Sequence, residues 1–267
     1  MFNKNYADLG LILQIDSLGV ATIYLNREKK HNALDDKMID GLNQILDDLV
    51  KLENIKILVL RANGKLFCAG ADLNQMQAMI NYTYQENYAD AERLSQVFYK
   101  LDQFSCPTIA VINGPAYGGG VGLICCTDLA ISISTAEFCL SEVRLGLVPA
   151  VISPYLVKKM GYTQAKRYML TAEKISSSRA LELNILSEIV DTPEALDLKA
   201  NQLVSILLNN SPQAMRQVKK LLQDINNSIY SLEYGIEAIA RLRMSPEGQE
   251  GLLAFLEKRT PNWCKHD

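Results

Sequence analysis

Phe67-Cys68-Ala69-Gly70-Ala71-Asp72 follows the short apolar run Ile55–Arg61 and precedes a helical pattern that begins at Leu73. A second glycine-containing turn, Gly114–Gly122, follows the apolar run Pro107–Asn113 in the same way. Strand-to-helix turns leave backbone N–H groups without intrahelical partners, and glycine lets a bulky group approach the backbone closely. The two turns therefore predict an oxyanion hole that stabilises a developing negative charge.

The glycines of the second turn match neither of the common phosphate-binding loops. A Walker A loop requires Lys and then Ser or Thr after its last glycine, whereas Gly120 is followed by Val121. A dinucleotide fingerprint requires the spacing G-x-G-x-x-G, and the frame that starts at Gly118 ends on Leu123. Glycines that serve only close helix packing remain the alternative explanation.

The surrounding pattern predicts an α/β core. Leu11–Ile15 and Val20–Leu25 form a probable hairpin, and Asn32–Asp35 opens a helix that leads into the Ile55–Arg61 strand. A strand, a helix and a neighbouring strand in this order form a β-α-β crossover. Further elements are predicted as a helix over Glu86–Leu101 and strands over Leu129–Ile133 and Glu137–Leu140.

From about Ile152 onward the pattern predicts helices only. The clearest of these run over Ala195–Leu208, Pro212–Ile225 and Leu232–Met244. We place a boundary near Glu194, with residues 1–194 as the core and residues 195–267 as a helical region packed on it.

Composition excludes several classes of protein. The formal net charge of −3 and the pI near 5.6 argue against nucleic-acid binding. No apolar run approaches the roughly 18 residues that a membrane span needs, and the first residues do not form a signal peptide, so we expect a cytoplasmic protein.

The cysteine and histidine content speaks against disulfides and metals. No two of the six cysteines form a C-x-x-C pair, so we expect reduced, mostly buried thiols. Only two histidines are present, which excludes a histidine-rich metal site, and no metal is expected. A hydrolase triad could use only His31, and no G-x-S-x-G elbow accompanies it.

One acid stands out in the segment Ser141–Pro149, where Glu142 follows the predicted Glu137–Leu140 strand. A carboxylate at a strand end is usually a surface charge. Only a cleft would perturb its pKa and make it a candidate catalytic group.

Taken in order, these segments resemble the enoyl-CoA hydratase/isomerase (crotonase) family. The resemblance rests on Asn32–Leu34, Phe67–Leu73, Asn113–Gly120, Ser141–Pro149 and the C-terminal Glu250–Pro261, so it covers nearly the whole chain. It implies a crotonase-type (ClpP-like) spiral of β-β-α units with a C-terminal helical trimerisation region. It also implies a homotrimer or a homohexamer built as a dimer of trimers.

The resemblance assigns roles to particular residues. The oxyanion-hole donors would be the backbone N–H groups of Ala71 and Gly119, and Glu142 would be the catalytic acid/base. The adenine of CoA would contact backbone carbonyls near Ala33, Ala69 and Ala71. Its phosphates would contact Lys29, and Lys258 of a neighbouring subunit. The remaining residues that the resemblance implies at the acyl-CoA site are Asp72, Leu73, Tyr117, Gly122 and Phe255. No cofactor is implied beyond the CoA of the substrate.

The sequence departs from the family at Gly122, where two-glutamate hydratases carry a second acid. Loss of one acid should cost about 10²–10⁴-fold in general acid-base catalysis unless another group replaces it. One explanation is a Δ3-Δ2-enoyl-CoA isomerase, in which Glu142 alone takes a proton from one carbon and returns it to another.

The other explanation is a hydratase of a branched 2-enoyl-CoA. Gly118–Leu123 and Leu145–Tyr155 resemble bacterial hydratases of 3-methylglutaconyl-CoA and isohexenylglutaconyl-CoA, which favours 3-methylglutaconyl-CoA of leucine breakdown as the substrate. Glycine at position 122 would remove a like charge and open space for the branched acid, with Arg144 or Arg167 as its partner. A non-catalytic CoA- or RNA-binding protein of the same fold is the third possibility.

Overall fold

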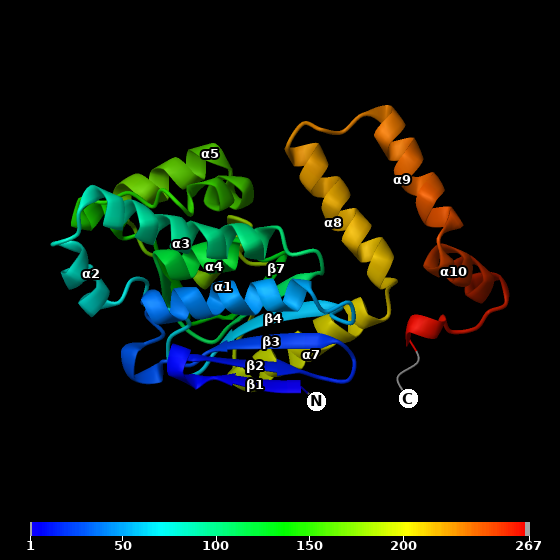
Figure 1. Ribbon diagram of the computed structural model, residues 1–267, viewed down its shortest axis with the longest axis horizontal. Coiled ribbons are helices and arrows are strands. Elements are labelled where there is room, and N and C mark those ends of the chain that lie inside the picture. Colours follow the sequence, from blue (N-terminus) through cyan, green and yellow to red (C-terminus); the bar gives the residue numbers. More distant parts are fainter. Residues whose placement is uncertain (1, 265–267) are drawn as a thin grey trace.

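The computed structural model describes residues 2–264 and, within them, the side chains of residues 6–264. Strands and helices alternate along most of the chain, which confirms the predicted α/β class (Figure 1). The strands are β1 (Phe2–Tyr6), β2 (Leu11–Ile15), β3 (Val20–Leu25), β4 (Ile57–Ala62), β5 (Thr108–Ile112), β6 (Ala116–Tyr117), β7 (Leu129–Ile133), β8 (Glu137–Cys139), β9 (Ile175–Ser176) and β10 (Glu188–Val190). The helices are α1 (Asp36–Val50), α2 (Leu73–Met79), α3 (Tyr84–Asp102), α4 (Gly119–Cys125), α5 (Ser153–Thr171), α6 (Ser177–Glu182), α7 (Pro193–Leu208), α8 (Pro212–Asn226), α9 (Leu232–Met244) and α10 (Pro246–Leu256).

A seven-stranded sheet in the order β1-β2-β3-β4-β5-β7-β10 forms the centre of the core. Strands β1, β2 and β3 are antiparallel, and the predicted hairpin is confirmed as β2 and β3. From β3 to β10 all neighbours are parallel. Parallel strands are usually covered on both faces, and every residue of β5 is accordingly buried.

Helices cover both faces of this sheet. The larger apolar cluster joins one face to α1, α3 and α4, and includes Met38, Leu42 and Phe98. The smaller cluster joins the other face to α7 through Leu196 and Ala200. The predicted helical region therefore begins with a helix that packs directly on the sheet.

A second sheet, in the order β6-β8-β9, lies next to the ends of the large sheet and positions the two glycine turns. Strand β6 pairs in parallel with β8, and an isolated parallel bridge joins Cys68 to Ala116. A second bridge joins Leu34 to Ala71. Three segments that are distant in sequence thus meet beside the first turn of α4.

The prediction of helices only beyond Ile152 is wrong, because β9 and β10 are strands there. Both are too short to show a clear periodicity, since β9 has two residues and β10 has three. Each is completed by long-range pairing, β9 with β8 and β10 with β7. Sequence windows do not detect such pairing.

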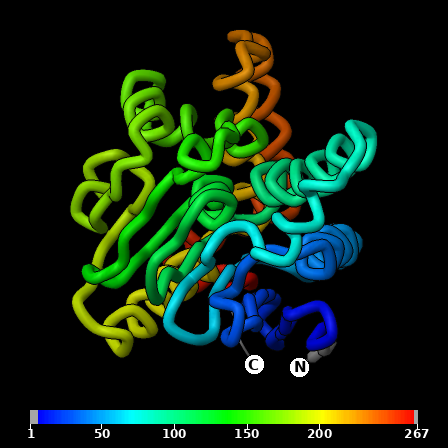
Figure 2. Tube along the Cα trace, turned by 90° about the vertical axis from the view of Figure 1, so that its left-hand side faces the viewer, coloured from blue at the N-terminus to red at the C-terminus, as the bar shows by residue number. Residues whose placement is uncertain are grey.

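Helices α9 and α10 extend beyond the core, at the end of the molecule opposite α2 (Figure 1). In Figure 2, which views the α2 side, these C-terminal helices lie behind the core. Among the described residues, none of the helices combines the length and the apolar character that crossing a bilayer requires.

Candidate active site

The two glycine turns lie side by side. The N–H of Phe67 donates to the carbonyl of Pro115 at 3.0 Å, and the N–H of Tyr117 donates to that of Cys68 at 2.9 Å. Ala71 and Gly119 each lie three residues beyond a partner of the Cys68–Ala116 bridge. The parallel register therefore brings these two residues to the same edge.

Glycine is required at two positions of these turns. Gly70 has φ +86° and Gly118 has φ +48°, which is the region that residues with a Cβ rarely adopt. A Cβ on Gly118 would also lie 3.0 Å from Oε1 of Glu142. The bare backbone at Gly118 thus allows the carboxylate of Glu142 to reach the start of α4.

The N–H groups of Ala71 and Gly119 donate to no acceptor among the described residues. Their neighbours are paired: the N–H of Asp72 donates to the carbonyl of Leu34, and the N–H of Gly118 to that of Cys139, both at 2.9 Å. Ala71 is exposed and Gly119 is half-buried, so a ligand oxygen can reach both donors. Two free donors on adjacent turns are what an oxyanion hole requires.

Glu142 stands at the start of a short 3-10 helix, Glu142–Leu145, that follows β8. Burial raises the pKa of its carboxyl group, and the residue's own backbone N–H opposes that rise only in part. Its Oε2 is buried and has no hydrogen-bond partner within the described residues. A half-buried carboxyl with an unsatisfied oxygen and a raised pKa is a suitable proton carrier at neutral pH.

The space at Gly122 is filled, so the expectation that this glycine opens room for a branched acid is wrong. A Cβ on Gly122 would lie 2.3 Å from Cγ2 of Ile152 and 3.0 Å from Cε1 of Phe98. Both side chains are buried in the core. An apolar wall therefore occupies the place where a second acid would project, and Glu142 is the carboxylate that reaches the start of α4.

Asp72 supports the first turn rather than facing a ligand. Its carboxylate accepts from the N–H of Asn74 at 2.8 Å, which caps α2, and pairs with Arg27 at 3.0 Å. Burial raises its pKa, but these hydrogen bonds outweigh burial and leave the pKa below its usual value. Sequence reasoning missed Arg27, which also donates to the carbonyl of Ala33 and pairs with Asp35 at 2.8 Å.

The backbone carbonyls expected at the adenine pocket differ in their availability. The carbonyl of Ala33 already accepts from Arg27, whereas those of Ala69 and Ala71 accept from no described residue. The hydroxyl of Tyr117 donates to Glu137 at 3.2 Å. Burial and that hydrogen bond both raise the pKa of Tyr117.

The two arginines considered as partners of a substrate carboxylate have other contacts. Arg144 donates to the carbonyl of Ala172 at 2.6 Å, and Arg167 pairs with Glu173 at 2.8 Å. The structure therefore offers no support for either arginine as a carboxylate receptor. His31 is exposed, and no carboxylate of the described residues forms a hydrogen bond or ion pair with its side chain.

The remaining expected contact residues are exposed. Leu73 is 80% exposed at the start of α2, and Lys29 is exposed in the short 3-10 turn Glu28–Lys30. Phe255, in α10, is 82% exposed, and Lys258 follows that helix. Because α10 and α2 lie at opposite ends of the molecule (Figure 1), Phe255 and Lys258 cannot complete the turn site of their own chain.

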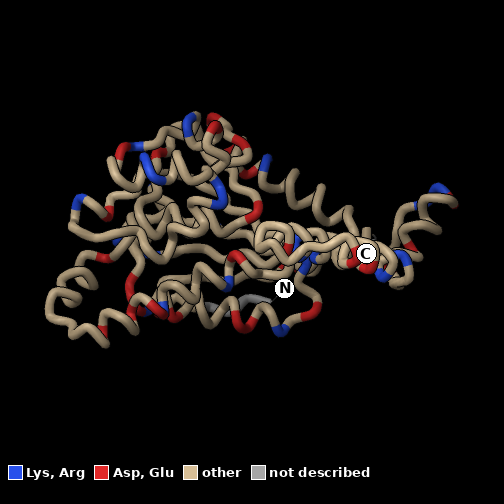
Figure 3. The backbone as a smooth tube through the Cα atoms, turned by 90° about the horizontal axis from the view of Figure 1, so that it is seen from above, with Lys and Arg blue, Asp and Glu red and all other residues tan. Residues whose placement is uncertain are grey.

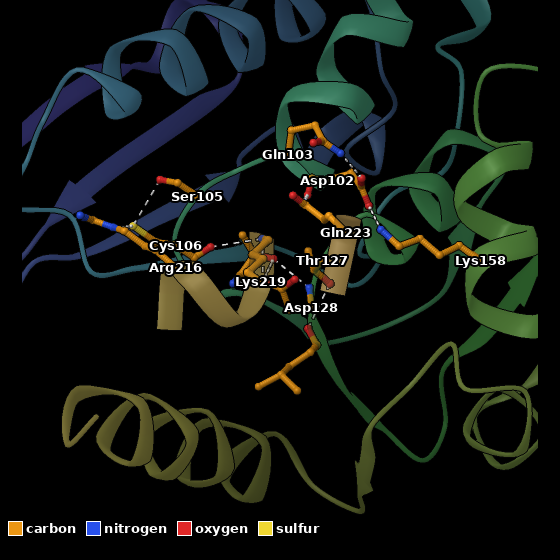
Figure 4. A network of polar contacts seen from close by, with 12 residues as sticks. Asp102, Gln103, Ser105, Cys106, Thr127, Asp128, Lys158, Arg216, Lys219 and Gln223 are labelled. Atoms are coloured by element: carbon orange, nitrogen blue, oxygen red, sulfur yellow. Dashed lines mark hydrogen bonds and ion pairs between the residues drawn. The ribbon is translucent and has the colours of Figure 1, made fainter. Parts of the chain in front are cut away.

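A separate cavity of about 760 Å³ lies between α8 and the core. Lys219 on α8 pairs with Asp128 at 2.7 Å, and Lys158 on α5 pairs with Asp102 at 2.8 Å (Figure 4). Neither Ala71, Gly119 nor Glu142 lines this cavity. Lys219 and Gln223 anchor α8 to the core through Asp128 and the carbonyl of Asp102, so the site of the two turns remains the candidate for catalysis.

Neither the charge distribution nor the arrangement of potential metal ligands points to another site in the described residues. Lys and Arg lie among Asp and Glu along the same segments (Figure 3). No group of three or more His, Cys, Asp or Glu within the described range could hold a metal ion. All six cysteines are free thiols, and five are buried. Cys68 packs beneath the turns, because a Cβ on Gly120 would lie 2.7 Å from the Cβ of Cys68.

Comparison with known proteins shows the family of this chain. A model of the enoyl-CoA hydratase/isomerase family matches residues 16–266. A putative enoyl-CoA hydratase of Thermus thermophilus is 32% identical over 94% of this chain and 100% of its own length.

Solved structures agree closely as well. An enoyl-CoA hydratase from Shewanella pealeana is 46% identical, with a TM-score of 0.91 over 97% of this chain and 100% of that one. A putative enoyl-CoA hydratase/isomerase (crotonase) from Legionella pneumophila is 41% identical, with a TM-score of 0.90 over 95% of this chain and 98% of that one. Together with the paired turns and Glu142, these matches show that the chain is an enzyme of the enoyl-CoA hydratase/isomerase family with the crotonase fold.

Proposed function

We propose that this chain adds water to the double bond of a branched 2-enoyl-CoA. The observation that carries the proposal is the pair of unpartnered N–H groups, on Ala71 and Gly119, beside the unsatisfied carboxyl oxygen of Glu142. A thioester oxygen held by both donors becomes an enolate oxygen when the oxygen of water bonds to the β-carbon. Glu142 accepts the proton that the water loses and delivers a proton to the α-carbon, so the carboxylate is regenerated.

For the acyl group we propose 3-methylglutaconyl, the intermediate of leucine breakdown. Support comes from the resemblance of Gly118–Leu123 and Leu145–Tyr155 to hydratases of such acids. An Escherichia coli relative, 29% identical over 91% of this chain, is named 2,3-dehydroadipyl-CoA hydratase, and that name denotes an acyl group with its own carboxylate. Because Ile152 fills the space at Gly122, the substrate's carboxylate would lie away from that wall.

A Δ3-Δ2-enoyl-CoA isomerase is the second candidate. The specific observation in its favour is the single carboxylate, since moving a double bond needs one base that removes a proton and returns it elsewhere. Incubation with 3-methylglutaconyl-CoA and, separately, with a 3-enoyl-CoA tests both candidates. Mass analysis of the products decides between them, because hydration adds one water to the acyl group and isomerisation leaves its mass unchanged.

The remaining parts of the proposal concern CoA and assembly. We propose that Lys29 and a neighbouring subunit's copy of Lys258 bind the CoA phosphates, that residues 195–267 form the assembly region, and that no cofactor is needed. Exposed apolar side chains on α9 and α10, such as Ile236 at 51% and Phe255 at 82%, support a homotrimer or a homohexamer. We propose a cytoplasmic location. Light scattering during size-exclusion chromatography measures the assembly directly, and a monomer at catalytic concentrations would contradict this arrangement.

A further inference from the structure

One polar side chain of helix α2 reaches into the core. Gln75 is the only buried residue of α2. The apolar side chains contribute less, because Leu73 is 80% exposed, Ile80, just past the end of the helix, is 81% exposed, and Met76 and Met79 are only half-buried. The attachment of α2 therefore depends on what the Gln75 amide contacts.

That amide connects three helices. Its Nε2 donates to Oδ1 of Asp36, at the start of α1, at 2.9 Å, and to Oδ1 of Asp90, in α3, at 3.2 Å. A side-chain amide has two N–H donors and no charge, so it can bridge two carboxylates without adding a third negative group. Arg93 donates to the same two oxygens, at 2.6 Å and 3.1 Å, and offsets their mutual repulsion.

Helix α2 continues directly from the candidate oxyanion turn. Asp72 is both the residue after Ala71 and the N-cap of α2. On one side of Ala71 the carbonyl of Gly70 accepts from the N–H of Leu34 at 2.7 Å, and on the other the N–H of Asp72 donates to the carbonyl of Leu34 at 2.9 Å. The peptide unit that carries the Ala71 N–H therefore belongs to the Leu34 bridge, and α2 begins directly after that bridge. A shift of α2 would act on this peptide unit through Asp72, which is the N-cap of α2 and whose N–H also belongs to the bridge.

We propose that Gln75 is a positioning residue: by bridging Asp36 and Asp90, its amide fixes α2 and thereby aims the N–H of Ala71 at the thioester oxygen. This inference rests on the proposed function only in its use of an enolate intermediate, which hydration and isomerisation share. A displacement of about 1 Å at a reacting centre can cost roughly 10²-fold in rate. Removal of the bridge should therefore reduce turnover without removing any group that contacts the substrate.

The test compares three variants with the wild-type enzyme. Gln75→Met keeps the length of the side chain and removes both hydrogen bonds. Gln75→Glu replaces the donor with a third carboxylate. The double variant Gln75→Glu/Asp90→Asn exchanges the two groups, so that a new amide at position 90 can donate to the new carboxylate at position 75. Gln77→Met, on the exposed part of the same helix, is the matched control. Thermal unfolding of each variant checks that it is folded at the assay temperature.

Two readouts are needed. The first is kcat and KM for the acyl-CoA substrate: we expect Gln75→Met to lower kcat by about 10-fold to 10²-fold with a smaller change in KM. The second is the ultraviolet band of the enolate of acetoacetyl-CoA, a β-keto thioester that an oxyanion hole should bind as its enolate. We expect that band to weaken in Gln75→Met and Gln75→Glu, to recover in the double variant, and to be unchanged in Gln77→Met.

The two readouts separate this inference from the proposed function. A wild-type enzyme that shows the enolate band but turns over neither substrate would contradict the proposed function and leave the inference supported by the variants. Conversely, wild-type turnover with an unchanged kcat and enolate band in Gln75→Met would overturn the inference alone. Equal losses in Gln75→Met and Gln77→Met, or no recovery in the double variant, would also overturn it.

Discussion

Replacement of Gly122 by glutamate would restore the second acid of two-glutamate hydratases, but this chain has no room for it. Gly122 lies in α4 and does not have a positive φ, so the obstacle is steric rather than conformational. Its missing Cβ would lie 2.3 Å from Ile152 and 3.0 Å from Phe98, and neither buried side chain can move into solvent. We expect Gly122→Glu to destabilise the fold and Ile152→Ala to relieve that effect.

The expected size of the effect follows from these contacts. Overpacking of a close-packed core costs about 1–3 kcal/mol, and 1 kcal/mol shifts the Tm of a chain of this size by roughly 2–4 °C, so Gly122→Glu should lower the Tm by roughly 2–12 °C. Ile152→Ala alone should cost about 2–5 kcal/mol through the cavity it leaves. In the double variant the new side chain fills that cavity, and we expect a favourable coupling of about 1–3 kcal/mol.

A double-mutant cycle measured by denaturant unfolding at one fixed protein concentration tests this reasoning. Gly122→Ala is the control, because it introduces the clash of the Cβ without a charge. Hydration assays on the double variant then show whether a second acid at this position is functional. Additive effects of the two substitutions, or a Gly122→Glu variant as stable as the wild-type enzyme, would refute the account of the Ile152 wall.

Three further predictions concern catalysis, stability and CoA binding. Glu142→Gln should abolish turnover while the affinity for CoA stays within a few-fold of wild type, and near-normal turnover in the variant would contradict the role of Glu142. Because burial raises the pKa of this carboxyl group, wild-type activity should fall with decreasing pH at a midpoint above 4.5, the ordinary pKa of glutamate. Asp72→Asn should cost about 1.5–3 kcal/mol at neutral pH. Because the pKa of Asp72 is lowered in the folded state, this loss of stability should be present above pH 3.8, the ordinary pKa of aspartate, and should disappear as the pH falls below it. A loss of stability that persists in acid would argue against the ion pair with Arg27. Lys258→Ala should raise KM for acyl-CoA with little change in kcat, and the rise in KM should be larger at low salt. An unchanged KM at every salt concentration would exclude Lys258 from the phosphate site.

The sequence predicted the turns of this site because their signals are local. Glycines between an apolar strand and a helix indicate free N–H groups, and neither Ala71 nor Gly119 has an acceptor in the part of the chain that the structure describes. The α/β class and the β2–β3 hairpin were predictable for the same reason, since apolar runs and a short turn define them within a few residues.

What the sequence did not predict depends on long-range contacts. Ile152 lies far along the chain from Gly122, and only the folded core shows that the first fills the space beside the second. Strands β9 and β10 form because β8 and β7 are available to pair with them. Arg27 and Gln75 have ordinary polar sequence neighbours, and their partners come from other segments of the chain.

The packing of Cys68 beneath the turns has a chemical consequence for a protein that binds thioesters. A thiolate close to an acyl-CoA could exchange acyl groups with it and leave the protein covalently acylated. Burial raises the pKa of Cys68 to about 12, despite an opposing hydrogen bond from Gly70, so almost none of it is ionised at neutral pH. A small residue thus fits under the glycine backbone and, at the proposed acyl-CoA site, is protected against self-acylation.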